Sequence, residues 1–352
     1  MSFRTKRVLF ITPFYILFEF FLLKYIFLIF GGVEDIYLIV FAVLIGLNHF
    51  MPMIFEAHKS RRFTRGLSIL DGVWMWASVM FLIDILIIYL LGSIMAVPTV
   101  VNVCLLAVVP VLGLYNYWKA HNLVVHEKTL NLSNLDHDIR IAHLSDVHFG
   151  SVRHKRIISD ISDKLNDLDC DLAIISGDLA DGSSVVFEDD FEAFGKVDIP
   201  IVFTPGNHDF YPGIESVINA CRNAGVIVLD GESFEFEGLN IYGHGYRFED
   251  KGFPNVDKSL IKQDMVNIVN YHVPYFWEEF SDLGFDVQLS GHTHGGQFYP
   301  IVWFGNLLFD YNMGLFKNND GKYLHVTTGV GSMDTPTRWG TDSEMVILNL
   351  TK

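Results

Sequence analysis

The chain has 352 residues, half of them hydrophobic, and a formal net charge of −16 at pH 7. Residues 119–352 hold 17 of the 25 Lys and Arg but 35 of the 41 Asp and Glu, a balance of −18. This argues against a nucleic acid as partner, because such binding needs a surface that neutralises phosphates. The three cysteines form no even set, so a disulfide framework is not expected and the thiols fit a reducing, cytoplasmic compartment.

The first third of the chain contains four apolar blocks, at about residues 8–30, 36–55, 69–97 and 99–117. Each block is long enough to cross a bilayer, which takes about 20 helical residues. The blocks lack the polar face of a helix in a soluble bundle. The first block is also too long for a signal peptide, and no Ala-x-Ala site follows it. The sequence therefore predicts a four-helix transmembrane region over residues 1–118, with the lipid bilayer as a partner.

Basic residues lie on one side of these blocks. They are Arg4, Lys6 and Arg7 before the first block, Lys59, Arg61, Arg62 and Arg65 between the second and third, and Lys119 after the fourth. The other two connections contain no Lys or Arg. By the positive-inside rule, we expect an integral protein of the inner or cell membrane whose termini and whose domain over residues 119–352 face the cytoplasm.

Four ionisable residues inside the blocks receive no role from the sequence: Glu19, Lys24, Asp71 and Asp84. Ionisable groups in lipid mark either function or internal pairing. Lys24 is a candidate to pair with Asp84 across two helices, or with Glu19 on its own helix.

Residues 119–352 alternate β-type runs with helical stretches. We expect strands at 123–132, 139–144, 172–176, 201–204, 233–236, 239–242, 266–271, 287–290, 323–327 and 345–350, and helices at 154–168 and 213–223. This order predicts a single α/β domain of two facing mixed β-sheets flanked by helices.

Five short polar motifs occur in this domain. They are Asp146-Val147-His148, Gly177-Asp178-Leu179-Ala180-Asp181, Gly206-Asn207-His208-Asp209, the isolated His272, and Gly291-His292-Thr293-His294. Most of them follow a predicted strand, and side chains at strand ends can converge on one point. Taken singly, each has an ordinary explanation as a turn, a cap or a core histidine. Five in succession predict one metal site, with the glycines allowing sharp turns as the strands end.

The residue types indicate which ions this site would hold. Asp and Asn oxygens with His nitrogens suit Mn, Fe or Zn, and Mg less well, and the lack of Cys argues against a structural thiolate zinc site. Two divalent ions about 3.5–4 Å apart can clamp the attacking and leaving oxygens of a phosphoryl transfer. We therefore expect two divalent metal ions, with manganese the first choice and Fe, Zn or Mg as alternatives.

The ordered motifs D-x-H, G-D-x-x-D, G-N-H-D, H and G-H-x-H, over about residues 139–296, resemble the calcineurin-like metallophosphoesterases. The segment 291–297, with residues 328–331 and 336–338, is similar to a bacterial membrane-associated subgroup that includes UDP-2,3-diacylglucosamine pyrophosphatases. Ser343-Glu344 departs from this subgroup, whose chains have Pro-Glu there. The resemblance implies a metal-dependent phosphoesterase or pyrophosphatase.

The same resemblance implies a role for each matching residue. Asp146, His148 and His294 would hold one metal, Asn207, His272 and His292 the other, and Asp178 would bridge the two. His208 would act beside the metals, by stabilising the transition state or protonating the leaving oxygen, with Asp181 orienting its imidazole. Arg338 is a candidate phosphate ligand. The alternatives are a helix cap for Asp181 and a surface ion pair for Arg338.

Three functions remain open. The chain is a membrane-anchored hydrolase of a lipid or lipid-linked nucleotide, a hydrolase of soluble phosphoesters with an anchor, or a non-catalytic membrane sensor. Residues 298–309, an apolar and aromatic segment expected to be a loop, bear on this choice. In a functional interpretation they would form an acyl-chain groove or dip into the membrane interface. In a purely structural one they would form a buried strand or pack between the sheets.

Overall fold

The computed structural model describes residues 3–56, 58–249 and 252–352, and the side chains of residues 3–7, which include Arg4, Lys6 and Arg7, lie outside the described part. Contacts divide the chain into two units. One is Met1–Lys119 with Asp334–Thr337, and the other is Ala120–Met333 with Arg338–Lys352.

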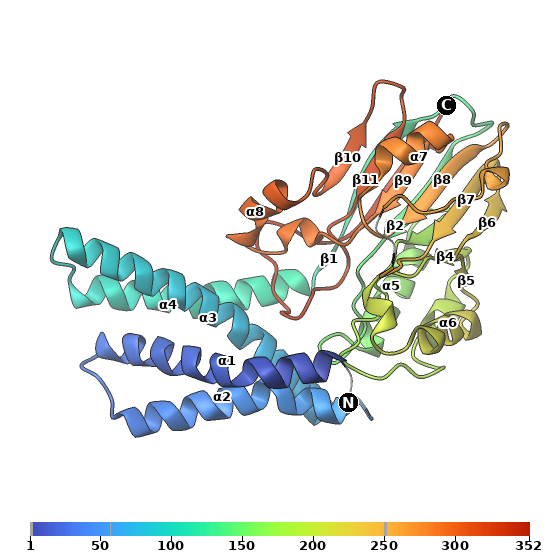
Figure 1. Cartoon of the computed structure of the whole chain (residues 1–352). Helices are drawn as coiled ribbons and strands as arrows, with labels where there is room; N and C mark the ends of the chain where they lie inside the picture. Colours follow the sequence, from blue (N-terminus) through green and yellow to red (C-terminus); the bar gives the residue numbers. More distant parts are fainter. Residues whose placement is uncertain (1–2, 57, 250–251) are drawn as a thin grey trace. The chain divides into compact units, whose positions relative to one another are not determined.

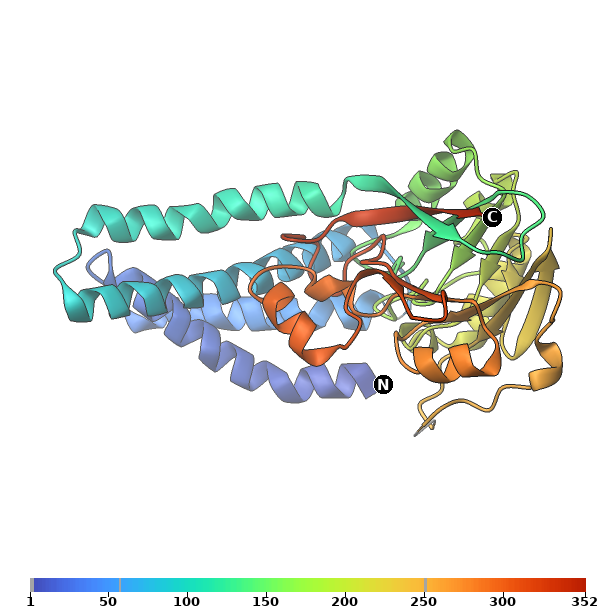
Figure 2. The same ribbon diagram turned by 90° about the horizontal axis from the view of Figure 1, so that it is seen from above.

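The first unit contains four long helices. They are α1 (Phe3–Leu28), α2 (Asp35–Glu56), α3 (Arg62–Ile94) and α4 (Thr99–Ala120). Each is long and apolar enough to cross a membrane, as predicted. Helix α1 packs on α2, and both pack on α3 (Figure 2). Helix α3 begins before its apolar stretch, so Arg62 and Arg65 are helical and not part of a loop; Arg is a good helix former.

The pairing predicted for Lys24 is wrong. Its Nζ lies 2.9 Å from a carboxylate oxygen of Asp35, at the start of α2. A long side chain can carry its charge toward the end of a helix, where pairing avoids burying an ion in lipid. Glu19 is buried and accepts hydrogen bonds from Trp74 Nε1 at 3.1 Å and Ser78 Oγ at 2.8 Å.

The second unit contains two six-stranded mixed sheets (Figure 1). The order of the first is β1 (Leu123–Asn131), β12 (Ser343–Thr351), β2 (Ile139–Leu144), β3 (Leu172–Ile175), β4 (Ile201–Phe203) and β5 (Ile227–Val228). The order of the second is β10 (Gly314–Lys317), β11 (Tyr323–Val326), β9 (Val287–Ser290), β8 (Val266–Tyr271), β7 (Leu239–His244) and β6 (Glu232–Phe236). The predicted fold class is confirmed.

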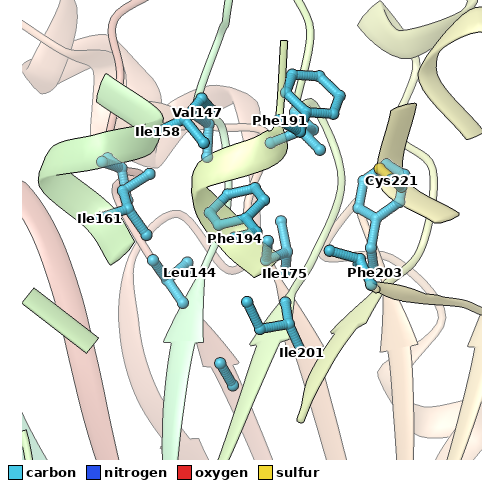
Figure 3. Close-up of a cluster of buried hydrophobic side chains, with 14 of the residues drawn as sticks. Leu144, Val147, Ile158, Ile161, Ile175, Phe191, Phe194, Ile201, Phe203 and Cys221 are labelled. Carbon is cyan, nitrogen blue, oxygen red and sulfur yellow. The ribbon is translucent and has the colours of Figure 1, made fainter. Parts of the chain in front are cut away.

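Apolar layers hold these sheets in place. One cluster fills the space between them, with Ile141 of β2 and Ile268 of β8 among its members. A second lies on the other face of the first sheet, where Leu144 and Ile175 pack with Ile158 and Ile161 (Figure 3). The last two belong to α5 (Lys155–Asp167), whose apolar residues recur at helical spacing. Helix α6 (Ile214–Asn223) joins the same layer, and α7 (Trp277–Leu283) contributes to a cluster on the second sheet.

The strand register determines which end of the first sheet carries the polar motifs. Strands β2, β3 and β4 are parallel, and β12 runs antiparallel to β2. Strand β1 is parallel to β12, with Leu123 opposite Ser343. The carboxyl ends of β2–β4 therefore lie at the end of the sheet where β1 begins, which is also where the chain enters the domain after Ala120.

Candidate metal centre

The predicted site residues follow strands of both sheets. Asp146 and His148 follow β2, Asp178 and Asp181 follow β3, Asn207 and His208 follow β4, His272 follows β8, and His292 and His294 follow β9. Strands of the two sheets therefore share the site. Almost all of these residues are buried or nearly so.

Several of these residues have an unusual backbone conformation. The φ angles are 52° at Asp146, 51° at His148, 53° at Asp178, 71° at His292 and 50° at His294. Non-glycine residues seldom adopt the left-handed region, and such strain gathers at functional sites. The surrounding fold therefore imposes these conformations, and it does so where five predicted ligands lie.

The first group of ligand atoms comes from Asp146, His148 and His294. All three side chains are buried, and their ligand atoms lie within 4.8 Å of one another. The two Nε2 atoms of the histidines are 3.0 Å apart, and Nε2 of His294 is 3.2 Å from Oδ1 of Asp146. Two imidazoles and one carboxylate directed at one point are a donor set that suits Mn, Fe or Zn.

The second group comes from Asp178, His272 and His292, again with ligand atoms within 4.8 Å. Nε2 of His272 is 3.1 Å from Oδ2 of Asp178, and Nδ1 of His292 is 3.3 Å from Nε2 of His272. Oδ1 of Asn207 lies 3.1 Å from Nδ1 of His292, so the predicted amide ligand also adjoins this group. The structure brings Asp178 into this group, and its role as a carboxylate shared by two ions stays a prediction.

The ligand histidines differ in protonation state. Burial, with the neighbouring His272 charge, lowers the pKa of His292 to about 4, and burial also lowers that of His294 to about 4. Both rings are therefore neutral, with lone pairs available at neutral pH. Burial opposes a charge on His272, but the Asp178 carboxylate outweighs it and raises the pKa of His272 to about 10. A cation that binds here would displace that proton.

Two groups support the ligands from outside the ligand sets. Nδ1 of His272 donates to the carbonyl oxygen of Ser176 at 2.6 Å, which directs Nε2 toward Asp178. The carboxylate of Asp209 accepts backbone N–H bonds from Asp178 at 2.9 Å, Ala180 at 2.8 Å and Gly206 at 2.8 Å. Asp209 therefore ties two of the motif loops together. The sequence had no signal for Ser176, because its backbone makes the contact.

His208 lies beside both groups without belonging to either. Its ring centroid is 4.9 Å from that of His148 and 5.1 Å from that of Tyr211. Its Nδ1 lies 3.3 Å from the backbone carbonyl oxygen of Asp181. The Asp181 carboxylate accepts bonds from N of Ser183 at 2.6 Å and from its Oγ at 2.7 Å. His208 and Asp181 are therefore in contact, but through the backbone carbonyl of Asp181 and not, as expected, through its carboxylate. Orientation of His208 by Asp181 stays a prediction.

Arg338 is fully buried, so the alternative of a surface ion pair is wrong. Its Nη2 donates to the carbonyl oxygens of Thr328 at 2.7 Å and Gly331 at 2.6 Å. The same atom lies 3.4 Å from Nδ1 of His294. These contacts stabilise the loop behind His294, and the predicted role in phosphate binding gains no support from them.

The motif glycines serve two different purposes. Gly177 has φ 85°, which fits the sharp turn expected there. Gly206 is needed for close approach, since a Cβ there would lie 2.5 Å from the backbone N of Asp178. Substitution at either position would disturb Asp178 or its neighbours.

Comparison with known proteins agrees with this geometry. The model of a family described as calcineurin-like phosphoesterase matches residues 139–296. A Helicobacter pylori J99 protein named as an uncharacterized metallophosphoesterase is 28% identical over 241 residues, 64% of this chain and 63% of that one. The chain thus spans a little under two thirds of that relative's length.

Two further relatives are similar to this chain. Uncharacterized protein YpbG of Bacillus subtilis is 32% identical over 249 residues, 67% of this chain and 90% of that one. A Danio rerio protein named as a transmembrane protein with metallophosphoesterase domain is 27% identical over 275 residues, 70% of this chain and 61% of that one. With its ordered motifs and paired ligand groups, the chain belongs to the calcineurin-like phosphoesterase family.

Proposed function

We propose that this protein is a membrane-anchored hydrolase that uses two divalent ions, manganese first among the candidates, to cleave a phosphoester or pyrophosphate. The observation that carries the proposal is the pair of buried ligand groups, each with one carboxylate and two histidines. Asp146, His148 and His294 would hold one ion, and Asn207, His272 and His292 the other, with Asp178 shared. Bound ions of this kind acidify a water and stabilise charge on phosphate oxygens.

His208 would assist from outside the ligand groups. A carbonyl can only accept a hydrogen bond, so Nδ1 of His208 donates to Asp181 and Nε2 is left for the substrate. This arrangement would let His208 contact a phosphate oxygen or the leaving oxygen. Asp181 would keep the imidazole oriented through the same carbonyl.

The proposed substrate class is a lipid or a lipid-linked nucleotide. Aromatic residues adjoin the centre on two sides, with half-exposed Tyr211 next to His208 and Phe309 with its ring centroid 6.0 Å from that of His292. Tyr275, also half-exposed, stacks on Phe309 at 6.3 Å. Apolar surroundings favour a substrate with apolar parts. UDP-2,3-diacylglucosamine is the specific candidate, and it comes from the subgroup resemblance.

Activity measurements would separate the three functions. We expect the purified full chain, loaded with Mn²⁺, to hydrolyse a lipid-linked pyrophosphate with higher kcat/KM than its deacylated analogue. Equal rates on both would favour a hydrolase of soluble phosphoesters with an anchor. Bound metal without turnover of any phosphoester in the panel would favour a sensor.

The membrane topology gives an independent prediction. The Lys and Arg between the second and third spans, and Lys119 after the fourth, imply cytoplasmic termini. Alkaline phosphatase fused after Lys352 should be inactive in cells, and a fluorescent protein fused there should fluoresce. An active alkaline phosphatase fusion would place the site outside the cytoplasm and refute this orientation.

A further inference from the structure

The segment after the last motif forms a helix with an exposed apolar face. Helix α8 (Ile301–Leu308) contains no charged residue. Its exposed fractions are 43% at Ile301, 68% at Trp303, 54% at Phe304, 80% at Leu307 and 71% at Leu308, whereas Val302 and Gly305 are buried. Neither the expected loop nor the alternative of a buried strand is correct. An apolar surface of this kind on a folded domain marks an interaction site.

The buried side of α8 is fixed to the metal-binding loop. A Cβ on Gly296 would lie 2.8 Å from the backbone of Val302, so the helix packs directly on the turn that follows His294. A Cβ on Gly305 would lie 2.7 Å from Asn312, whose carbonyl oxygen accepts a bond from Thr293 Oγ1 at 2.5 Å. The position of α8 is therefore tied to that of the loop carrying His292 and His294.

Helix α8 also begins at the end of the domain where the chain arrives from its last apolar helix. Phe298 forms a bridge with Gly340, and Oγ1 of Thr341 donates to the carbonyl oxygen of Gln297 at 2.9 Å. Two residues after Thr341, Ser343 begins β12 opposite Leu123. Leu123 is three residues from Ala120, the last residue of α4. Only His121 and Asn122 separate α4, which would span the bilayer, from the strand that begins at this end of the domain.

We infer that the exposed face of α8 lies in the interface of that same bilayer and brings the metal centre to the level of the lipid headgroups. The inference rests on the proposed function and names how the substrate is presented, as an amphiphile still seated in the membrane. A bilayer is favoured as occupant because the helix has no charge to select a protein partner. Trp303, whose ring contacts Tyr299 at 5.0 Å, is also a residue type that favours membrane interfaces.

Spin labelling tests this placement without reference to activity. The full chain with Cys104→Ala, in phosphatidylcholine nanodiscs, would carry a nitroxide at Leu307→Cys, while Cys170 and Cys221 are buried. We expect the label to be relaxed by oxygen and shielded from a water-soluble nickel chelate. The control is Asp136→Cys, an exposed position before β2 at the opposite end of the first sheet, where the reverse is expected. Equal accessibility of both labels to the nickel chelate would overturn the inference.

Kinetics test its consequence. Leu307→Glu with Leu308→Glu should lower kcat/KM for hexadecyl p-nitrophenyl phosphate in phosphatidylcholine vesicles by about tenfold, because two carboxylates oppose insertion. Ethyl p-nitrophenyl phosphate has the same leaving group and no chain, so its turnover should be unchanged. Phe187→Glu, at an exposed apolar residue next to Glu188 and Asp189, is the matched control and should affect neither ester.

The possible failures are distinguishable. An equal fall on both esters would show that α8 only supports the metal loop, and no fall on either would show that lipid contact is irrelevant, so both overturn the inference. If wild-type protein hydrolyses neither ester and no lipid-linked pyrophosphate, the proposed function fails, and the spin-label result still decides where α8 lies.

Discussion

Replacing Asp178 by alanine should remove most of the bound metal and lower turnover by about 10³-fold or more, since metal ions supply several kcal/mol of transition-state stabilisation. Its Oδ1 accepts the backbone N–H of His208 at 2.7 Å, and its Oδ2 lies 3.1 Å from Nε2 of His272. Burial disfavours the ionised form of Asp178, but the adjacent His272 and His208 imidazoles hold its pKa below the usual range. The carboxylate is therefore charged before any cation arrives. Removing it withdraws the one negative charge of its ligand group.

The backbone conformation of Asp178 makes asparagine the better substitution for a second variant. Asp178 has φ 53°, a conformation that asparagine tolerates better than alanine. Asp178→Asn keeps the shape and one oxygen but loses the charge, so it should also lose metal, with less effect on folding. Asp136→Ala, at an exposed carboxylate, should change neither property. Elemental analysis gives ions per chain, and circular dichroism checks the fold. Active wild-type protein with fewer than two ions would contradict the two-metal proposal.

The sequence predicted strands best where both faces of a strand are buried. The expected bounds of β2, β8 and β9 agree with the structure. In β2, Ile139 and Ile141 face the core between the sheets, while Ala142 and Leu144 face the outer layer. Each of these strands is rich in apolar residues with a few polar ones between them, and a polar motif begins within two residues of its end. The candidate site could be predicted for the same reason, because its residues mark the strand ends.

Tertiary contacts determined the features that the sequence did not predict. A short run such as residues 301–308 has no apolar period that separates helix from strand, so α8 was missed. Sequence also cannot tell which atoms of a residue make a contact, and Asp181 meets His208 through its carbonyl. Arginine side chains are usually exposed, but Arg338 is buried and donates to backbone carbonyl oxygens. In each case the contact depends on how the backbone folds and not on the residue type alone.

Replacing His208 by alanine should keep both ions and lower kcat by about 10²-fold, the usual contribution of a general acid or base. Its side chain belongs to neither ligand group, and its contact with Asp178 is made by the backbone N–H, which the substitution retains. His208→Ala should therefore lower turnover without lowering metal content, whereas Asp178→Ala should lower both. His137→Ala, at an exposed histidine paired with Glu237, is the matched control and should leave both unchanged.

The leaving group then distinguishes the two roles open to His208. An alkoxide needs a proton as it departs and p-nitrophenolate does not, so a proton donor should matter more for an alkyl ester. If Nε2 of His208 protonates the leaving oxygen, His208→Ala should lose more activity on a phosphate ester that releases an alkoxide than on one that releases p-nitrophenolate. If it stabilises charge on the phosphoryl oxygens, the loss of activity should be similar for the two leaving groups. Loss of an ion from His208→Ala would contradict both roles, because it would make His208 a ligand, which its direct contact with the Asp181 carbonyl argues against.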